Sequence, residues 1–284
     1  RPLYEESDKG DGYVSLEVNP YLANDTAATL SEAKRLWKRV NRPNLMVKIP
    51  ATVEGLPAIL SAIEAGINVN VTLIFSRERY WAVMEMYISG LARRVAAGLP
   101  VDSIASVASF FVSRVDTKVD GILNGMIDRG GARADKAAQF LGQAAIANAR
   151  LAYHDFEIIF GSERFAALKA KGARVQRPLW ASTGTKNPAY RDVVYIEELV
   201  GKDTVNTVPP ATLNAFLDHG VVRAGSLQED LAGAYQSMAR LEALGISMAE
   251  VTRELELEGV KSFAGAWKAL MDAMEASRKA VVGE

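Results

Sequence analysis

The stretch Asn44-Leu-Met-Val-Lys-Ile-Pro-Ala-Thr52 has the apolar character of a buried β-strand, and it contains one ammonium group, that of Lys48. Burial of an ammonium ion without a partner is costly, so such a lysine tends to lose its proton. A neutral amine is the nucleophile that forms a Schiff base with a carbonyl compound. The alternative is a lysine at a strand end whose ammonium reaches solvent. The flanking sequence favours the first interpretation.

Strand-like and helical runs alternate on both sides of this stretch. The strand-like runs fall at residues 13–19, 45–49, 68–75, 103–112, 178–182 and 204–208. Apolar residues recur at helical spacing in 27–40, 56–65, 77–97, 114–127, 190–200, 211–218 and 226–284, and in 133–171 with an interruption near Gly161. This alternation is typical of βα units that form one parallel sheet.

Polar side chains follow one face of several of these strands. Ser15 and Glu17 share a face of the first strand, and Asn68, Asn70 and Thr72 share a face of the third. A parallel strand that is covered by helices should be apolar on both faces, so a polar row predicts a face that looks into a barrel interior. An exposed antiparallel sheet would also show polar rows, but it fits poorly with a helix between every pair of strands.

The inward positions of five strands together predict a site for carbonyl chemistry. They carry Glu17, Lys48, Asn70, Thr72, Ser109 and Ser182. An amine that attacks a ketone forms a carbinolamine, which must lose water with acid assistance, and a water held by Glu17 and Thr72 suits that step. Asn70 and Ser109 are suited to bind the hydroxyl groups of a polyol.

Two cations follow strand ends and are candidates for a phosphate site. Arg114 comes just after the fourth strand, and Lys186 follows Trp180-Ala-Ser-Thr-Gly-Thr185. Arginine offers a bidentate fork and lysine a point charge, and the phosphate site of a barrel belongs at the carboxyl ends of its strands. The alternative is that both cations are solvated loop residues.

Composition narrows the classes of function. The net charge of −1 gives no electrostatic basis for binding nucleic acid or an anionic membrane. The chain has no cysteine, which excludes thiol nucleophiles and thiolate metal sites, and its two histidines are far apart, which disfavours a histidine metal cluster. There is no apolar run of 18 residues and no leader-like segment, so we expect a cytoplasmic protein.

Five segments resemble the successive strand motifs of transaldolases, in the same order along the chain. They are Val14-Ser-Leu-Glu-Val-Asn-Pro20, Val47-Lys-Ile-Pro-Ala-Thr52, Gly66-Ile-Asn-Val-Asn-Val-Thr-Leu-Ile-Phe-Ser76, Ser106-Val-Ala-Ser-Phe-Phe-Val-Ser-Arg114 and Trp180-Ala-Ser-Thr-Gly-Thr-Lys-Asn-Pro188. The last resembles the bacterial branch that includes fusions to glucose-6-phosphate isomerase. The resemblance implies an α/β fold, the TIM (β/α)8 barrel of class I aldolases.

The resemblance also implies a role for each candidate residue. Lys48 matches the Schiff-base lysine, and Glu17 and Thr72 match the pair that positions the catalytic water. Asn70, Ser109, Phe111 and Ser182 match residues that contact the sugar, Arg114 matches a phosphate-binding arginine, and Lys186 stands near a position where another branch carries arginine.

The implied reaction needs no cofactor and no metal. It transfers a dihydroxyacetone unit from sedoheptulose 7-phosphate or fructose 6-phosphate to glyceraldehyde 3-phosphate or erythrose 4-phosphate, in the pentose phosphate pathway. The partners would be phosphorylated sugars and a second copy in a homodimer. The alternatives are a fructose 6-phosphate aldolase, a non-catalytic sugar-phosphate binding protein, and a structural fragment that requires another chain.

The sequence departs from the family pattern at its start. Transaldolase barrels have eight strands, of which the first supplies an aspartate and the second an asparagine, and this chain begins at Arg1 after both motifs. Six strands cannot close such a barrel. We therefore expect one barrel domain over residues 1–284 that lacks its first two strands, with the helices of 226–284 packing on it.

Overall fold

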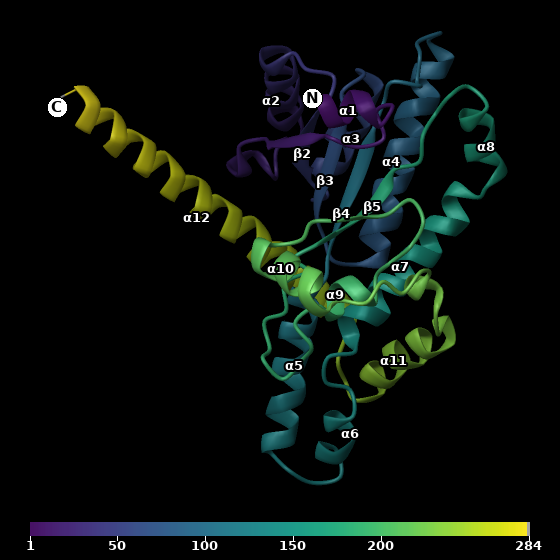
Figure 1. Cartoon of the computed structure of the whole chain (residues 1–284), viewed down its shortest axis with the longest axis vertical. Coiled ribbons are helices and arrows are strands. Elements are labelled where there is room, and N and C mark those ends of the chain that lie inside the picture. Colours follow the sequence, from purple (N-terminus) through teal and green to yellow (C-terminus); the bar gives the residue numbers. More distant parts are fainter. Residues whose placement is uncertain (283–284) are drawn as a thin grey trace.

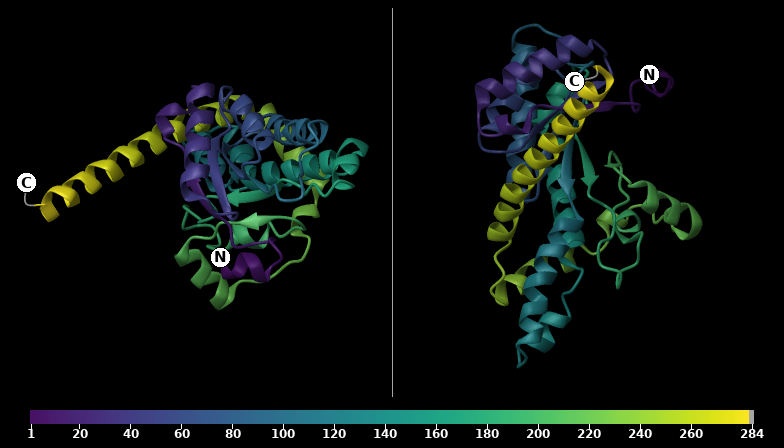
Figure 2. Two further views of the ribbon diagram at one scale, coloured as in Figure 1. Left: turned by 90° about the horizontal axis from the view of Figure 1, so that it is seen from above. Right: turned by 90° about the vertical axis from the view of Figure 1, so that its left-hand side faces the viewer.

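The computed structural model describes residues 1–282 and contains one sheet of six parallel strands, in the order β1-β2-β3-β4-β5-β6. The strands are β1 Val14–Glu17, β2 Leu45–Pro50, β3 Val69–Ile74, β4 Ser106–Phe111, β5 Arg177–Ala181 and β6 Val205–Asn206. Each strand pairs with the next strand along the chain, so the predicted series of βα units is confirmed. The sheet curls into part of a barrel, with β1 and β6 at its two edges (Figure 2).

Helices connect the strands, and further helices precede β1 and follow β6 (Figure 1). They are α1 Pro2–Glu6, α2 Thr26–Val40, α3 Gly55–Glu64, α4 Arg77–Ala96, α5 Ser113–Asp128, α6 Ala134–Ala138, α7 Ala144–Phe160, α8 Glu163–Lys169, α9 Val194–Glu197, α10 Pro210–His219, α11 Leu231–Ala243 and α12 Met248–Val282, with 3-10 turns η1 Pro20–Leu22 and η2 Ser226–Gln228. None of these helices, as far as residue 282, is long and apolar enough to cross a membrane.

Local side-chain contacts explain where several elements begin and end. The carboxylate of Asp25 and the hydroxyl of Ser76 accept hydrogen bonds from backbone amides and cap α2 and α4. The hydroxyl of Ser162 caps α8 in the same way, which divides the helical run at the predicted interruption. The first strand was predicted to reach residue 19 but ends at Glu17, because the Asn19 side chain accepts a hydrogen bond from the amide of Tyr21 and starts η1.

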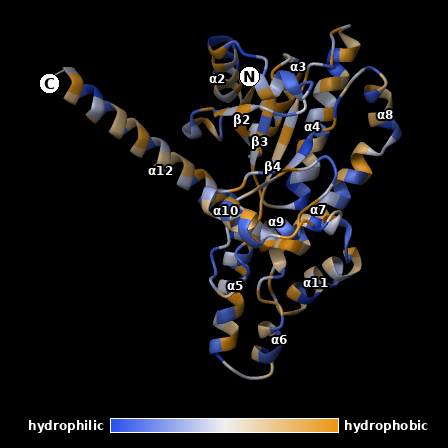
Figure 3. Cartoon of the chain, viewed as in Figure 1, coloured by the Kyte–Doolittle hydropathy of each residue, from blue (hydrophilic) through white to orange (hydrophobic). Residues whose placement is uncertain are grey.

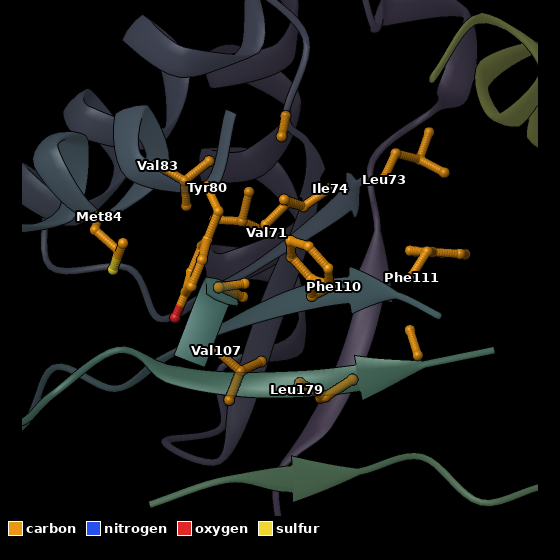
Figure 4. Close-up of a cluster of buried hydrophobic side chains, with 14 of the residues drawn as sticks. Val71, Leu73, Ile74, Tyr80, Val83, Met84, Val107, Phe110, Phe111 and Leu179 are labelled. Atoms are coloured by element: carbon orange, nitrogen blue, oxygen red, sulfur yellow. The ribbon is translucent and has the colours of Figure 1, made fainter. Parts of the chain in front are cut away.

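The main core lies between the outward-facing side chains of the central strands and the helices that cover them. Figure 4 shows the contact between Val71, Ile74 and Phe110 of the sheet and Tyr80, Val83 and Met84 of α4. The rings of Tyr80 and Phe110 meet edge to face at 5.9 Å. Gly90 lets α4 approach α3, since a Cβ atom there would lie 2.8 Å from the side chain of Ile63.

Helix α12 packs on the body through its first part and then extends away from it (Figures 1 and 2). Val251 and Leu255 are buried, and a Cβ atom at Gly259 would lie 2.8 Å from the side chain of Leu73 in β3. Farther along the helix, Leu270 and Met274 are more than half exposed. Figure 3 shows this projecting part banded with hydrophobic and hydrophilic residues along its length.

Candidate active site

The strand register places three of the predicted site residues side by side. Glu17 of β1 is paired with Lys48 of β2, and Lys48 is paired with Asn70 of β3. The Lys48 Nζ atom lies 3.8 Å from the Glu17 Oε2 atom, which is an ion-pair distance but too long for a hydrogen bond. The two side chains are 24% and 27% exposed, so both are mostly enclosed and both remain within reach of a ligand.

The carboxyl group of Glu17 is harder to ionise than that of an ordinary glutamate. Burial raises its pKa above the usual 4.5, and the positive charge of Lys48 opposes that shift without reversing it. A carboxyl group with a raised pKa keeps its proton to higher pH, so Glu17 can donate a proton near the amine of Lys48.

The side-chain amide of Asn70 is held by hydrogen bonds from both sides. Its Nδ2 atom donates to Ser15 Oγ at 2.9 Å, and its Oδ1 atom accepts from Ser109 Oγ at 2.7 Å. These two hydrogen bonds fix the orientation of the Asn70 amide group. They also link β1, β3 and β4 beside Lys48. Asn70 and Ser109 are therefore brought together with Lys48, as the sequence predicted.

Thr72 lies at the carboxyl end of β3, two residues beyond Asn70 and in register with Pro50. Its side chain is fully buried, and its hydroxyl has no hydrogen-bond partner among residues 1–282. A buried polar atom without a partner is uncommon and is accounted for by a bound water or ligand group. Thr72 can therefore hold a water molecule at this end of the strand.

A bulge immediately follows Thr72. The register between β3 and β4 shifts between Val71 and Ile74, and Leu73 has a φ of 59°, a left-handed conformation that is unfavourable for a branched side chain. Leu73 belongs to the buried cluster in Figure 4, and a Cβ atom at Gly259 of α12 would lie 2.8 Å from its side chain. The bulge thus interrupts the pairing of β3 with β4 just beyond the site residue Asn70.

The remaining candidates lie where β4 and β5 end. The guanidinium carbon of Arg114 lies 5.2 Å from the ring centre of Phe111, which is a cation–π contact. Ser182, whose φ is 57°, places its Oγ atom 3.0 Å from Ser113 Oγ. Lys186 is exposed on the loop after β5, where it lines a cavity of about 220 Å³ with Ser113.

A larger cavity of about 840 Å³ opens on the concave side of the sheet. Lys48, Asn70 and Ser109 line it, together with Arg174 and Arg177 near the opposite ends of the strands. These two arginines donate hydrogen bonds to the backbone carbonyls of Lys9 and Gly10, which holds the segment before β1 against the cavity. The cavity gives a small ligand direct access to the amine of Lys48.

Sequence reasoning assigned no site role to three residues of this arrangement, although it placed Ser15 on the same strand face as Glu17. Ser15 and Ser113 each hydrogen-bond to a predicted residue, and both stand within two positions of another candidate, so their spacing was a usable signal. Phe263 of α12 places its ring centre 5.3 Å from Lys48 Nζ. It is far from Lys48 in the sequence, and no local pattern indicates the contact.

Comparisons with known proteins find one matching family and several similar sequences. The sequence model of the family described as transaldolase/fructose-6-phosphate aldolase matches residues 4–274. The chain is 52% identical to a transaldolase of Mycolicibacterium smegmatis over 96% of its own length and 72% of that protein. It is 51% identical to transaldolase 1 of Streptomyces coelicolor, over 100% of this chain and 74% of that protein. A transaldolase of Thermobifida fusca is 51% identical, over 96% and 72% of the two chains.

Proposed function

The chain belongs to the transaldolase/fructose-6-phosphate aldolase family, and on that premise we propose that it is a transaldolase that carries a three-carbon unit on Lys48. The observation that carries the proposal is the enclosed pair of Lys48 and Glu17, with Nζ and Oε2 3.8 Å apart, beside the fixed amide of Asn70. Donors would be ketose phosphates such as sedoheptulose 7-phosphate or fructose 6-phosphate. Acceptors would be aldose phosphates such as glyceraldehyde 3-phosphate or erythrose 4-phosphate.

The first half of the reaction uses an amine and an acid. The Lys48 amine, once it has given up its proton, attacks the carbonyl carbon of the ketose and forms a carbinolamine. Glu17 supplies a proton to the departing hydroxyl through a water held by Thr72, so water leaves and a protonated imine forms. Burial raises the pKa of Glu17, so its carboxyl group takes up a proton more readily than that of an ordinary glutamate, which suits this step.

The second half moves the carbon unit. The imine accepts the electron pair of the C3–C4 bond while the C4 hydroxyl gives its proton to the Glu17 carboxylate that the first half leaves, so an aldose phosphate leaves and an enamine remains on Lys48. The enamine carbon then attacks the aldehyde of the acceptor, whose oxygen gains a proton, and water releases the new ketose. Asn70 and Ser109 hold the hydroxyl groups of the carried unit, and Ser182 and Phe111 line the sugar.

Arg114 and Lys186 bind the phosphate of the substrate in this proposal. We expect Arg114→Ala to raise the KM for fructose 6-phosphate about 10- to 100-fold with little change in kcat, because a hydrogen bond to a charged group contributes about 1.5–3 kcal/mol. Steady-state kinetics test this. Arg133→Ala, a change of an exposed arginine before α6, is the matched control. An unchanged KM in the Arg114 variant would remove this residue from the phosphate site.

A fructose 6-phosphate aldolase is the second candidate, because the family description names both activities. The two differ in the fate of the enamine, which an acceptor aldehyde intercepts in one case and a proton in the other. Incubation with fructose 6-phosphate and erythrose 4-phosphate separates them. A transaldolase yields sedoheptulose 7-phosphate and glyceraldehyde 3-phosphate, whereas an aldolase releases free dihydroxyacetone.

We also propose that residues 1–284 act as one domain, that the protein is cytoplasmic, and that it forms a homodimer. The absence of cysteine is compatible with the cytoplasm, and the exposed apolar side chains of Leu270 and Met274 are compatible with an interface. Light scattering coupled to size-exclusion chromatography measures the mass directly. A mass equal to the 30.7 kDa of one chain would rule out the dimer.

A further inference from the structure

Helix α5 carries two buried carboxylates on the same face, directly after Arg114. Asp116 is 2% exposed and Asp120 is 6% exposed, and they lie one helical turn apart. Burial raises the pKa of Asp116 to about 6, although a hydrogen bond from Tyr195 opposes the shift. Two apolar side chains would pack at this interface without that desolvation cost, so simple packing does not explain the pair.

Each carboxylate joins α5 to two other parts of the chain. Asp116 accepts a hydrogen bond from the amide of Ala145 at 2.7 Å and another from the Tyr195 hydroxyl at 2.6 Å. Asp120 accepts from the amide of Gly142 at 2.9 Å and from the Tyr190 hydroxyl at 2.7 Å. All four carboxylate oxygens therefore have a partner, and the tyrosine partners both come from the segment after β5.

Tyr190 lies in the loop that carries Lys186, and Tyr195 lies just after that loop, in α9. The loop begins at Ser182, whose backbone oxygen accepts from the amide of Ser113 at 3.1 Å and whose hydroxyl contacts Ser113 Oγ. It is then held to α5 at Tyr190 and Tyr195. Lys186 lies between the first and second of these attachments, while Arg114 is the second residue of α5.

A loop attached to one helix at three points has little freedom to move relative to that helix. The hydrogen bonds from the tyrosines therefore help to fix the position of the Lys186 loop relative to α5, the helix that carries Arg114. A phosphate needs its donors at a fixed separation, so small displacements of either cation weaken binding.

We propose that Asp116 and Asp120 are positioning residues, which act through Tyr195 and Tyr190 to hold the Lys186 loop at the spacing from Arg114 that a phosphate monoester requires. The inference rests on the proposed function, since it assigns both cations to the phosphate of the substrate. It adds that the buried face of α5 controls affinity for the phosphorylated end of the sugar and leaves the chemistry at Lys48 untouched.

The test uses Tyr190→Phe and Tyr195→Phe, which remove one hydroxyl each and keep the ring. In each variant we expect the KM for fructose 6-phosphate and the inhibition constant of inorganic phosphate to rise about tenfold, equivalent to about 1.4 kcal/mol, while kcat changes less than about twofold. Tyr153→Phe is the matched control, because this buried tyrosine donates to the backbone oxygen of Lys202, outside the proposed network. It should leave both constants unchanged.

A double-mutant cycle separates positioning from general stability. If Tyr190 acts through Lys186, then Tyr190→Phe should have almost no further effect on phosphate inhibition in a Lys186→Ala background. Additive effects, or a lower melting temperature with unchanged phosphate constants, would overturn the inference. If the unaltered protein shows neither turnover nor phosphate inhibition, the proposed function itself fails. Normal turnover and inhibition in the unaltered protein, with tyrosine variants that match it, would reject the inference alone.

Discussion

Lys48→Met is expected to lower kcat by about four orders of magnitude or more, because it removes the nucleophile on which both halves of the proposed reaction depend. Methionine keeps an unbranched side chain, so the apolar contacts of β2 should survive and the melting temperature should change little. The measurement is the transfer rate from fructose 6-phosphate to erythrose 4-phosphate at saturating substrate, with thermal unfolding recorded in parallel.

Lys136→Met provides the control for this substitution. Lys136 is an exposed lysine on α6, outside the candidate site, so the same chemical change there should leave the transfer rate intact. A Lys48 variant that unfolds at the temperature of the unaltered protein and retains more than about one hundredth of its rate would exclude Lys48 as the Schiff-base residue.

Glu17→Gln is expected to lower kcat about 10²- to 10³-fold, because glutamine cannot supply the proton for carbinolamine dehydration. The KM should change little, since the sugar hydroxyls and the phosphate are bound by other side chains. Rapid-mixing measurements of imine formation on Lys48 should show that this early step has become rate-limiting. An unchanged rate of imine formation would contradict the assignment of Glu17 as the acid.

The same substitution should alter the pH dependence of stability. The pKa of Glu17 is higher in the folded protein than its ordinary value of 4.5, so the folded state holds this proton more tightly than the unfolded state. Stability contributed by the protonated group is present below pH 4.5 and is lost as pH rises through the folded pKa. Chemical denaturation at pH 4 and pH 7 should therefore show the unaltered protein losing stability relative to the glutamine variant as pH rises.

Glu256→Gln is a matched control that separates the two effects of Glu17. Burial also raises the pKa of Glu256 on α12. Its Oε2 atom lies 3.4 Å from the Nε atom of Arg79 on α4. Its replacement should shift the pH dependence of stability in the same direction without a comparable loss of turnover. A similar loss of turnover would indicate that kcat follows stability and that Glu17 has no special chemical role.

Much of the fold follows from local pattern. Six strand-like runs predicted the six strands, and alternation of polar and apolar residues predicted that Glu17, Lys48 and Asn70 share the concave face. These predictions succeed because strand periodicity and helix capping act over a few residues, so the information lies within each segment.

The elements that the sequence did not predict depend on contacts between distant segments. The bulge at Leu73 is accommodated by Gly259 of α12, and the ring over Lys48 is that of Phe263. Tyr195 and Asp116 are 79 residues apart, and neither lies in a motif that indicates pairing. The pattern of a single sequence indicates on which face of its strand or helix a side chain lies. Which distant residue that side chain contacts depends on how the helices pack.

The most direct test of the central claim is intact mass after incubation with fructose 6-phosphate and borohydride, followed by peptide mapping. Borohydride reduces an imine to a stable amine, so a Schiff base becomes a permanent adduct. We predict one adduct per chain, located at Lys48 and absent in the Lys48→Met variant. A folded protein without an adduct, or one modified at another lysine, would contradict the proposal that Lys48 carries the substrate.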